Sequence, residues 1–278
     1  MGLFSAMKAQ KAYRAQQKGD KEEAIRLYEE AFSEGVNDAR YNLAYALLII
    51  REGQYQKAKE FLVAHQKTPG MTPEQRTTLL VDYAACCFRL GDVDKGIRTL
   101  EQQFRKTETG LLYQTLGYLY VEKYDQKNRE AFLNNARAAA EEPEKDGEEL
   151  SAEEEKEAAL PGQTPEEAWE AGVEQAEAFL QKALDYDDVD PICLDNMGQF
   201  LYRVRGDKQA AKPWFEKAIA KKDTQIDTLY FLSRYDEEAG NKAAAVQKLE
   251  KAAEGRFSPL NYCTRDIVLG EIKRLKGE

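Results

Sequence analysis

Residues 229–253 read LYFLSRYDEEAGNKAAAVQKLEKAA, and residues 194–219 read LDNMGQFLYRVRGDKQAAKPWFEKAI. In each stretch, two helical patterns flank a glycine that is followed by a polar residue, Gly240-Asn241 in the first and Gly206-Asp207 in the second. After each pair, small and large residues recur at intervals of three and four, which is the spacing of one helix face. The repeated unit is therefore a helix, a tight turn and a second helix.

The same unit recurs along the chain. Gly19-Asp20, Gly53-Gln54 and Gly91-Asp92 begin similar segments, and the helical pattern before most of these pairs has a small residue in its middle. The small residues are Ala44, Ala84, Gly117, Gly198 and Ser233. A small residue lets two helices approach closely, and a unit of this size must stack on its neighbours to bury its apolar faces.

This pattern resembles the tetratricopeptide repeat family, most strongly over residues 194–219 and 229–253 and more weakly over 8–32. The resemblance implies an all-α fold, a right-handed α-solenoid of about six helix-turn-helix repeats with a C-terminal capping helix. The predicted organisation is repeat 1 at 1–36, repeat 2 at 37–70, repeat 3 at 71–108, repeat 4 at 109–186, repeat 5 at 187–223, repeat 6 at 224–256 and the capping helix at 257–278.

Repeat 4 is predicted to be interrupted by an acidic insertion at about 124–164. Its first helix matches 110–123, and its second helix matches 166–186, with Thr164 as the cap and Pro165 in the first turn. The alternative is that the alanine-rich residues 128–140 form the second helix. If the insertion interpretation holds, residues 128–162 add no face to the stack, and their deletion should leave the melting temperature nearly unchanged.

The net charge of −10 is concentrated in one segment. Between Glu141 and Glu170, thirteen acidic residues outnumber two lysines, which leaves the rest of the chain close to neutral. Without a basic stripe to neutralise phosphates, we expect neither nucleic acid nor an anionic membrane surface as a partner.

Several other functional classes are also disfavoured. No run of about 18 apolar residues occurs, so we expect no membrane span, and the start of the chain lacks the features of a secretion signal.

With a single histidine, His65, and no phosphate-binding loop, we expect no metal, no cofactor and no catalytic activity. Four cysteines without Cys-x-x-Cys spacing predict buried free thiols and a cytoplasmic location. They are Cys86, Cys87, Cys193 and Cys263.

In the family that the chain resembles, the first helices line a concave groove, which implies a binding surface for another protein or peptide. Tyrosine recurs at the outward-pointing positions, and aromatic and arginine side chains are common in binding hot spots. The candidate groove residues are Tyr13, Tyr41, Asn42, Tyr45, Phe88, Tyr118, Gln199, Tyr202, Arg203, Tyr230 and Arg234. The alternative is that several of these rings only pack between repeats.

Some family members hold the acidic C-terminal tail of heat-shock chaperones with a Lys/Asn/Lys/Arg clamp. Asn42 matches the clamp's second-repeat asparagine, but Ala12, Thr78 and Asp82 stand where an asparagine, a lysine and an arginine would be needed. Because Asp82 would repel a carboxylate, we expect no chaperone tail as the partner.

The leading prediction is a non-enzymatic adaptor or scaffold that binds a partner segment along the tyrosine-rich groove. A second hypothesis is a self-associating structural scaffold whose solenoid ends or convex faces stack, with Trp169 and Trp214 in the contacts. An enzyme is the remote alternative.

Overall fold

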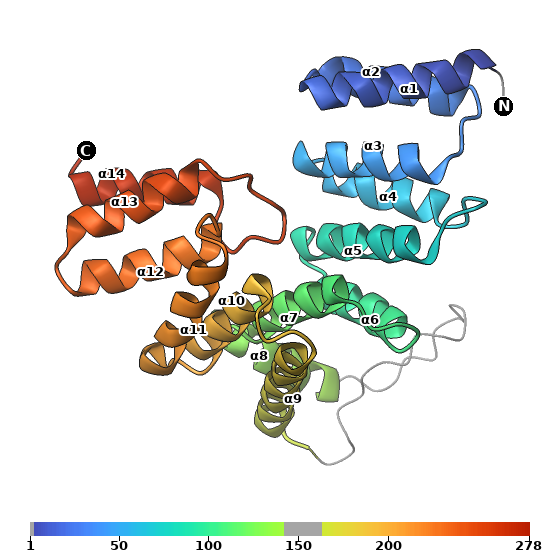
Figure 1. Ribbon diagram of the computed structural model, residues 1–278. Helices are drawn as coiled ribbons and strands as arrows, with labels where there is room; N and C mark the ends of the chain where they lie inside the picture. The colour runs from blue at the N-terminus through green and yellow to red at the C-terminus, as the bar shows by residue number, and fades with distance from the viewer. Residues whose placement is uncertain (1–2, 142–162) are drawn as a thin grey trace. The chain divides into compact units, whose positions relative to one another are not determined.

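The computed structural model describes residues 3–141 and 163–278, and these residues form helices joined by short turns (Figure 1). The helices are α1 (Leu3–Lys18), α2 (Lys21–Ser33), α3 (Ala39–Arg51), α4 (Tyr55–His65), α5 (Pro73–Arg89), α6 (Val93–Phe104), α7 (Gly110–Tyr124), the 3-10 turn η1 (Gln126–Asn128), α8 (Arg129–Glu141), α9 (Pro165–Tyr186), α10 (Pro191–Gln199), the π-turn η2 (Phe200–Val204), α11 (Lys208–Lys221), α12 (Ile226–Glu238), α13 (Lys242–Ala253) and α14 (Arg265–Lys276). No helix in the described ranges is both long and apolar enough to cross a bilayer.

The glycine–polar pairs form the turns between helices, as the sequence indicates. Gly240 has φ +78°, a left-handed conformation that glycine adopts without strain, and it ends α12. The side chain of the next residue, Asn241, accepts a hydrogen bond from the Ala244 N–H at 3.2 Å and so caps α13. Each glycine–polar pair ends one helix and starts the next. The recurrence of these pairs along the chain therefore determines where the helix pairs occur.

Thr-Pro motifs begin two helices, and the helix start predicted at Thr164 is confirmed. Thr72 Oγ accepts from the Gln75 N–H at 3.2 Å, and Thr164 Oγ accepts from the Glu167 N–H at 3.2 Å. In both cases, the side chain at the third helical position bonds back to the threonine N–H, which completes a capping box. These local bonds define where α5 and α9 begin.

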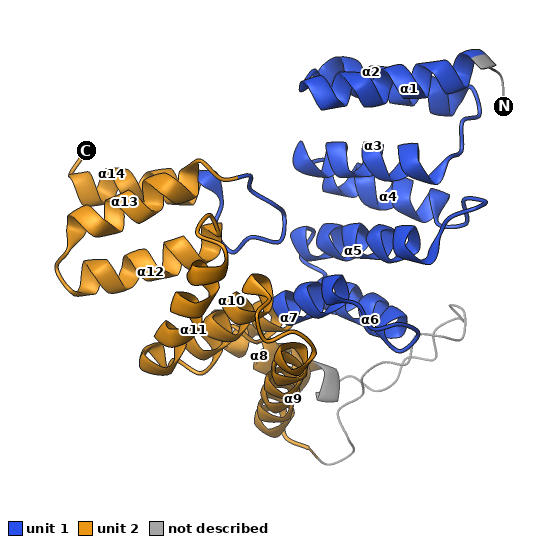
Figure 2. Ribbon diagram, in the orientation of Figure 1, with its two compact units in different colours: residues 1–119, 256–265 blue, residues 120–255, 266–278 orange. Residues whose placement is uncertain are grey.

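The chain divides into two compact units (Figure 2). Unit 1 consists of residues 1–119 and 256–265. In it, α1 pairs with α2, α3 with α4 and α5 with α6, and neighbouring pairs stack. Tyr28, Ile49 and Leu62 lie in its core with at most 1% exposure. The segment 256–265 belongs to this unit because the Arg89 guanidinium donates hydrogen bonds to the carbonyls of Pro259 at 2.6 Å and Asn261 at 3.0 Å.

The small residue at the centre of α3 is Ala46, which is fully buried, whereas Ala44 is only half-buried. The prediction that Ala44 occupies this position is therefore wrong. Ala46 lies seven residues before Gly53, the same spacing that separates the buried Ala84 from Gly91. A two-residue shift on a helix moves side chains by about 200°, so it changes which residues face the core.

Unit 2 consists of residues 120–255 and 266–278. Here α10 pairs with α11 and α12 with α13, α11 packs on α12, and α9 packs on both α8 and α10. The last helix, α14, buries Val268, Ile272 and Leu275. It corresponds to the helix predicted near the end of the chain.

Both helices proposed for the second half of repeat 4 are present. α9 contacts the end of α7 through Trp169 with Tyr124, whose ring centroids are 5.4 Å apart, and through Phe179 with Tyr120 at 5.2 Å. These contacts support the interpretation of α9 as the partner of α7, and the repeat boundaries stay a prediction. The acidic residues 142–162 lie outside the described residues.

α8 is not an unpacked appendage. The ring of Phe132 lies 5.2 Å from the ring of Trp169 in α9, and Leu133 is 6% exposed. The expectation that residues 128–162 add no packed face is therefore wrong for α8, because this helix shares apolar side chains with α9.

Candidate functional site

The predicted groove residues fall into different environments. Two of them lie in the core of unit 1: Asn42 is 1% exposed and Tyr45 is 2% exposed. The Asn42 amide donates to Asn37 Oδ1 and Thr68 Oγ1, both at 2.9 Å. The Tyr45 ring lies among other aromatic rings, and its hydroxyl donates to Glu29 at 2.9 Å. We therefore do not count Asn42 and Tyr45 among the residues that a partner can contact.

Three predicted residues in unit 1, Tyr13, Tyr41 and Phe88, are half-buried. Tyr13 and Tyr41 come together across α1 and α3, with ring centroids 6.5 Å apart in a T-shaped arrangement. Phe88 lies in α5 and packs edge-on against Tyr118 of α7, which is buried at 4% exposure. The structure thus joins Tyr13 to Tyr41 and places Phe88 in a separate pair.

Arg40 completes a tyrosine–arginine cluster with Tyr13 and Tyr41. Its guanidinium carbon lies 4.5 Å from the centre of the Tyr13 ring and 5.5 Å from that of Tyr41. Such cation–π contacts hold a planar guanidinium in place. Arg40 is exposed and forms no ion pair with a carboxylate in the described ranges. Arg40 is not among the predicted groove residues, although its position directly before Tyr41 at the start of a helix was a signal.

Two predicted groove residues of repeat 5, Gln199 and Arg203, belong to a buried polar network in unit 2, centred on Arg203. The Arg203 Nη2 atom lies 2.8 Å from Glu122 Oε1 and 2.7 Å from Asp125 Oδ2. Its Nε donates to Asp125 at 2.8 Å, and its Nη1 donates to Gln199 Oε1 at 2.7 Å. All four residues are at most 7% exposed. We call this set, with Asp195 and Thr228 described next, the Arg203 network.

The network continues from Gln199 to α12. The Gln199 amide donates to Asp195 Oδ2 at 2.6 Å, and the Thr228 hydroxyl donates to Asp195 Oδ1 at 2.5 Å. Burial, with the charge of Asp227 adding to it, raises the pKa of Asp195 from 3.8 to about 7. Three first helices, α7, α10 with η2, and α12, are thus linked by polar side chains.

A π-turn positions Arg203. The Arg205 N–H bonds to the carbonyl of Phe200, five residues back, and Phe200–Val204 form η2. Gly198 lies eight residues before Gly206, whereas the corresponding small residues of other repeats lie seven before their glycine. One turn of π-helix, η2, accommodates the extra residue. Such single π-helical turns are frequent at functional sites. This spacing was the sequence signal that could have located it.

Asp195 should make the stability of unit 2 depend on pH. Between about pH 4 and 7, the folded state keeps a proton that the unfolded state has released, because the folded pKa is raised to about 7. The free energy of unfolding therefore falls as pH rises through this window. Urea titrations between these limits, followed by tryptophan fluorescence, should show a smaller decrease in an Asp195→Asn variant. Equal decreases in both proteins would contradict the assignment.

The groove residues of the last predicted repeat are already paired within unit 2. Arg234 Nη2 donates to the Tyr230 hydroxyl at 2.7 Å, and its Nη1 lies 2.8 Å from Glu271 in α14. Tyr230 is 8% exposed. Tyr202, the third predicted groove residue of repeat 5, is half-buried, with its ring 5.1 Å from that of Phe231 in α12. These side chains stabilise the end of unit 2, so they offer a partner less than the tyrosine–arginine cluster does.

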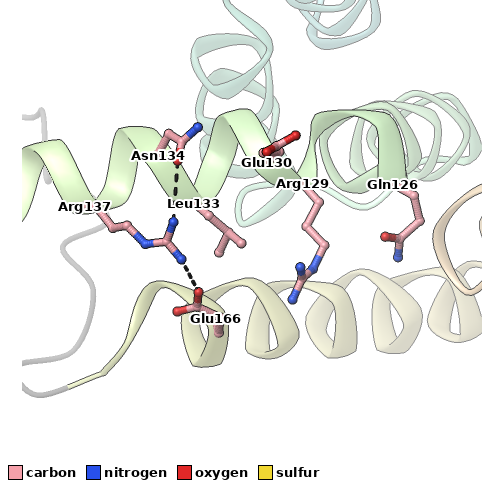
Figure 3. Close-up of a pocket in the computed structure, with 7 residues that line it drawn as sticks. All are labelled: Gln126, Arg129, Glu130, Leu133, Asn134, Arg137 and Glu166. Carbon is pink, nitrogen blue, oxygen red and sulfur yellow. Dashed lines mark hydrogen bonds and ion pairs between the residues drawn. The ribbon is translucent and has the colours of Figure 1, made fainter.

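A pocket of about 450 Å³ lies between α8 and α9 (Figure 3). Its wall includes Arg129, Leu133 and Arg137 from α8 and Glu166 from α9. Arg137 is bonded to Glu166, and Glu130 also lines the pocket. The lining thus contains two arginines and two glutamates, and this balance favours neither an anionic nor a cationic ligand.

The chemistry available elsewhere is limited. All four cysteines are free and buried, as predicted, and burial raises the pKa of the Cys87 thiol. Over the described ranges, no group of His, Cys, Asp and Glu side chains could hold a metal ion.

Comparison with solved structures identifies the fold. A tetratricopeptide repeat protein from Thermus thermophilus superimposes with a TM-score of 0.58 at 16% identity, covering 87% of this chain and 100% of that one. The chain has the tetratricopeptide-repeat fold. This fold also relates it to PilW, a type IV pilus biogenesis factor, with a TM-score of 0.54 at 15% identity and coverage of 94% of this chain and 98% of that one. The predicted all-α solenoid class is confirmed, and the predicted resemblance to tetratricopeptide repeat proteins is confirmed for the fold.

Other comparisons add two findings. The human IFIT1 dimer with m7Gppp-AAAA matches with a TM-score of 0.55 at 16% identity, over 96% of this tetratricopeptide-repeat chain and 53% of that chain. The family model for anaphase-promoting complex, cyclosome, subunit 3 matches residues 17–103. No curated protein matches the chain.

Proposed function

We propose that this protein is a non-enzymatic scaffold that binds a segment of a partner protein on the first-helix face of unit 1. The tyrosine–arginine cluster of Tyr13, Arg40 and Tyr41 carries the proposal. A cytoplasmic location, predicted from the free cysteines, is part of it.

The cluster has the properties of a binding hot spot. Two half-exposed tyrosine rings offer a large contact area, and Arg40 offers a guanidinium whose orientation is already restricted by stacking. Because less side-chain freedom is lost on binding, a restricted arginine gains more from each contact than a freely rotating one. Tyrosine and arginine are also enriched among residues whose truncation weakens binding most.

Affinity capture from a lysate of the source organism tests this proposal. We expect the Tyr13→Ala/Arg40→Ala/Tyr41→Ala variant to lose its main prey, since hot-spot truncations cost about 2 kcal/mol or more each. Arg98→Ala is the matched control because Arg98 is an exposed arginine on α6, a second helix of the same unit.

Circular dichroism establishes that both variants are folded. Tyr45 is left unchanged because its removal would damage the core. Retention of every prey by the folded triple variant would contradict binding at this cluster.

Self-association is a second candidate, favoured by one observation. Phe4 and Met7 lie one turn apart on α1 and are 80% and 46% exposed. Trp169 is fully buried, so it cannot serve in a contact between copies as the sequence analysis supposed. Light scattering across a concentration series, with Phe4→Glu/Met7→Glu as the comparison, tests this candidate. A monomer at every concentration would exclude it.

A further inference from the structure

We propose that the partner segment bound on the first-helix face of unit 1 is acidic, and that a stripe along α3 receives its carboxylates. This inference rests on the proposed scaffold function and names the partner's chemistry. The stripe consists of Arg40, Ala44, Leu47 and Arg51, which are spaced at four, three and four residues along the helix.

The spacing places both arginines on one side of α3. Eleven residues correspond to just over three full helical turns, so the side chains of Arg40 and Arg51 leave the helix in nearly the same direction. Ala44 and Leu47, between them, are half-buried, while the two arginines are exposed. The stripe is therefore an apolar strip with a cation at each end.

Arg51 has a second arginine beside it. Partial removal of its guanidinium from water lowers the pKa of Arg51, and the nearby charge of Arg256 lowers it further. Neither guanidinium makes a hydrogen bond or an ion pair with another side chain in the described ranges. Like charges brought together cost free energy, and an anion placed between them relieves that cost. Since Arg256 lies in the segment 256–265, unit 1 itself holds this pair together.

Asp82 is the carboxylate whose charge acts on Arg51. Burial raises the pKa of Asp82 to about 7, with Arg51 opposing the shift. The raised pKa favours the neutral carboxyl, and even an ionised Asp82 would cancel only one of the two charges of Arg51 and Arg256. Asp82 therefore repels a carboxylate ligand less than the fully charged side chain assumed from the sequence would. The proposed contacts also differ from the chaperone-tail clamp, since the arginines used are Arg40, Arg51 and Arg256.

The stripe predicts the spacing of the partner's acidic residues. Arg40 and Arg51 are separated by roughly 16 Å along the helix axis, at about 1.5 Å per residue. An extended peptide rises about 3.3 Å per residue, so two carboxylates about five residues apart reach both arginines. An apolar residue between the two acids would lie over Ala44 and Leu47.

Fluorescence anisotropy with the full chain tests the inference. The probe is a labelled peptide of about ten residues with two glutamates five residues apart and a leucine between them. Its control has glutamine in place of both glutamates. We expect the glutamate peptide to bind about tenfold tighter, because charge-assisted bonds to arginine exceed neutral ones by about 1.4 kcal/mol. Arg40→Gln and Arg51→Gln should each remove most of this preference, and Arg98→Gln should leave it intact.

Three results would overturn the proposal. One is equal affinity for the two peptides, and another is no detectable binding of the glutamate peptide at millimolar concentration. The third is binding of a short adenylate oligonucleotide that Arg40→Gln and Arg51→Gln abolish, without binding of the glutamate peptide, because the stripe would then serve nucleic acid.

The same variants separate this inference from the scaffold function. If the Tyr13/Arg40/Tyr41 variant loses its captured prey while Arg51→Gln retains it at full strength, the scaffold function stands and the acidic partner is wrong.

Discussion

Replacing Arg203 with alanine is expected to lower the free energy of unfolding of unit 2 by about 3–5 kcal/mol. Glu122 and Asp125 are 6% and 7% exposed, and Arg203 is the buried cation between them. Without Arg203, the two carboxylates stay in a poorly solvated site. Lys127 lies 3.5 Å from Asp125, but its side chain is 55% exposed, so it stabilises the carboxylates only weakly. Removing one partner of a buried ion pair costs far more than forming the pair gains.

Urea unfolding followed by tryptophan fluorescence measures this loss, since Trp169 and Trp214 both lie in unit 2. Arg205→Ala is the matched control: Arg205 lies two residues further on and pairs with Glu177 at the surface. That variant should lose about 1 kcal/mol or less. Losses of similar size in the two variants would show that the Arg203 network is not a buried ion cluster.

Trp169→Ala is expected to destabilise unit 2 by a similar amount, about 3–5 kcal/mol. The side chain is fully buried, and its ring lies 5.4 Å from Tyr124 of α7 and 5.2 Å from Phe132 of α8. Its removal would leave a cavity where three helices meet, and rings on two other helices cannot all move to fill it.

The second tryptophan supplies the control. Trp214 in α11 is half-buried, with Lys217 4.5 Å from its ring, so Trp214→Ala should cost about 1 kcal/mol. Far-UV circular dichroism during urea unfolding measures both variants without relying on the deleted fluorophore. If both losses were equally small, α9 would not be anchored to α7 and α8 as the contacts indicate, and the insertion interpretation of repeat 4 would lose its main support.

The arrangement of helix pairs could be predicted from the sequence because its causes are local. A glycine in the left-handed conformation at φ +78°, followed by a capping Asn241, involves neighbouring residues only. The same holds for the capping boxes that begin α5 and α9. The three- and four-residue spacing of small and large side chains then indicates which face of each helix is buried.

The candidate site was predicted less well, because helix register decides it. Tyr45 and Asn42 were assigned to the groove from a register two residues away from the observed one, and both are core residues. A shift of this size turns a side chain from one face of a helix to the opposite face. Tyr13 and Tyr41 were chosen from the same pattern, and they meet in a half-exposed pair.

The sequence by itself determined the repeat, the turns and the helix caps, since each depends on residues within a few positions of one another. Only the tertiary structure decided the partners of the charged side chains. Arg203 meets Asp125 across 78 residues of chain, and Arg89 bonds to the carbonyl of Pro259 across 170. Local periodicity states which face a residue occupies, whereas these pairings depend on how distant helices pack and on which side chains that packing removes from water.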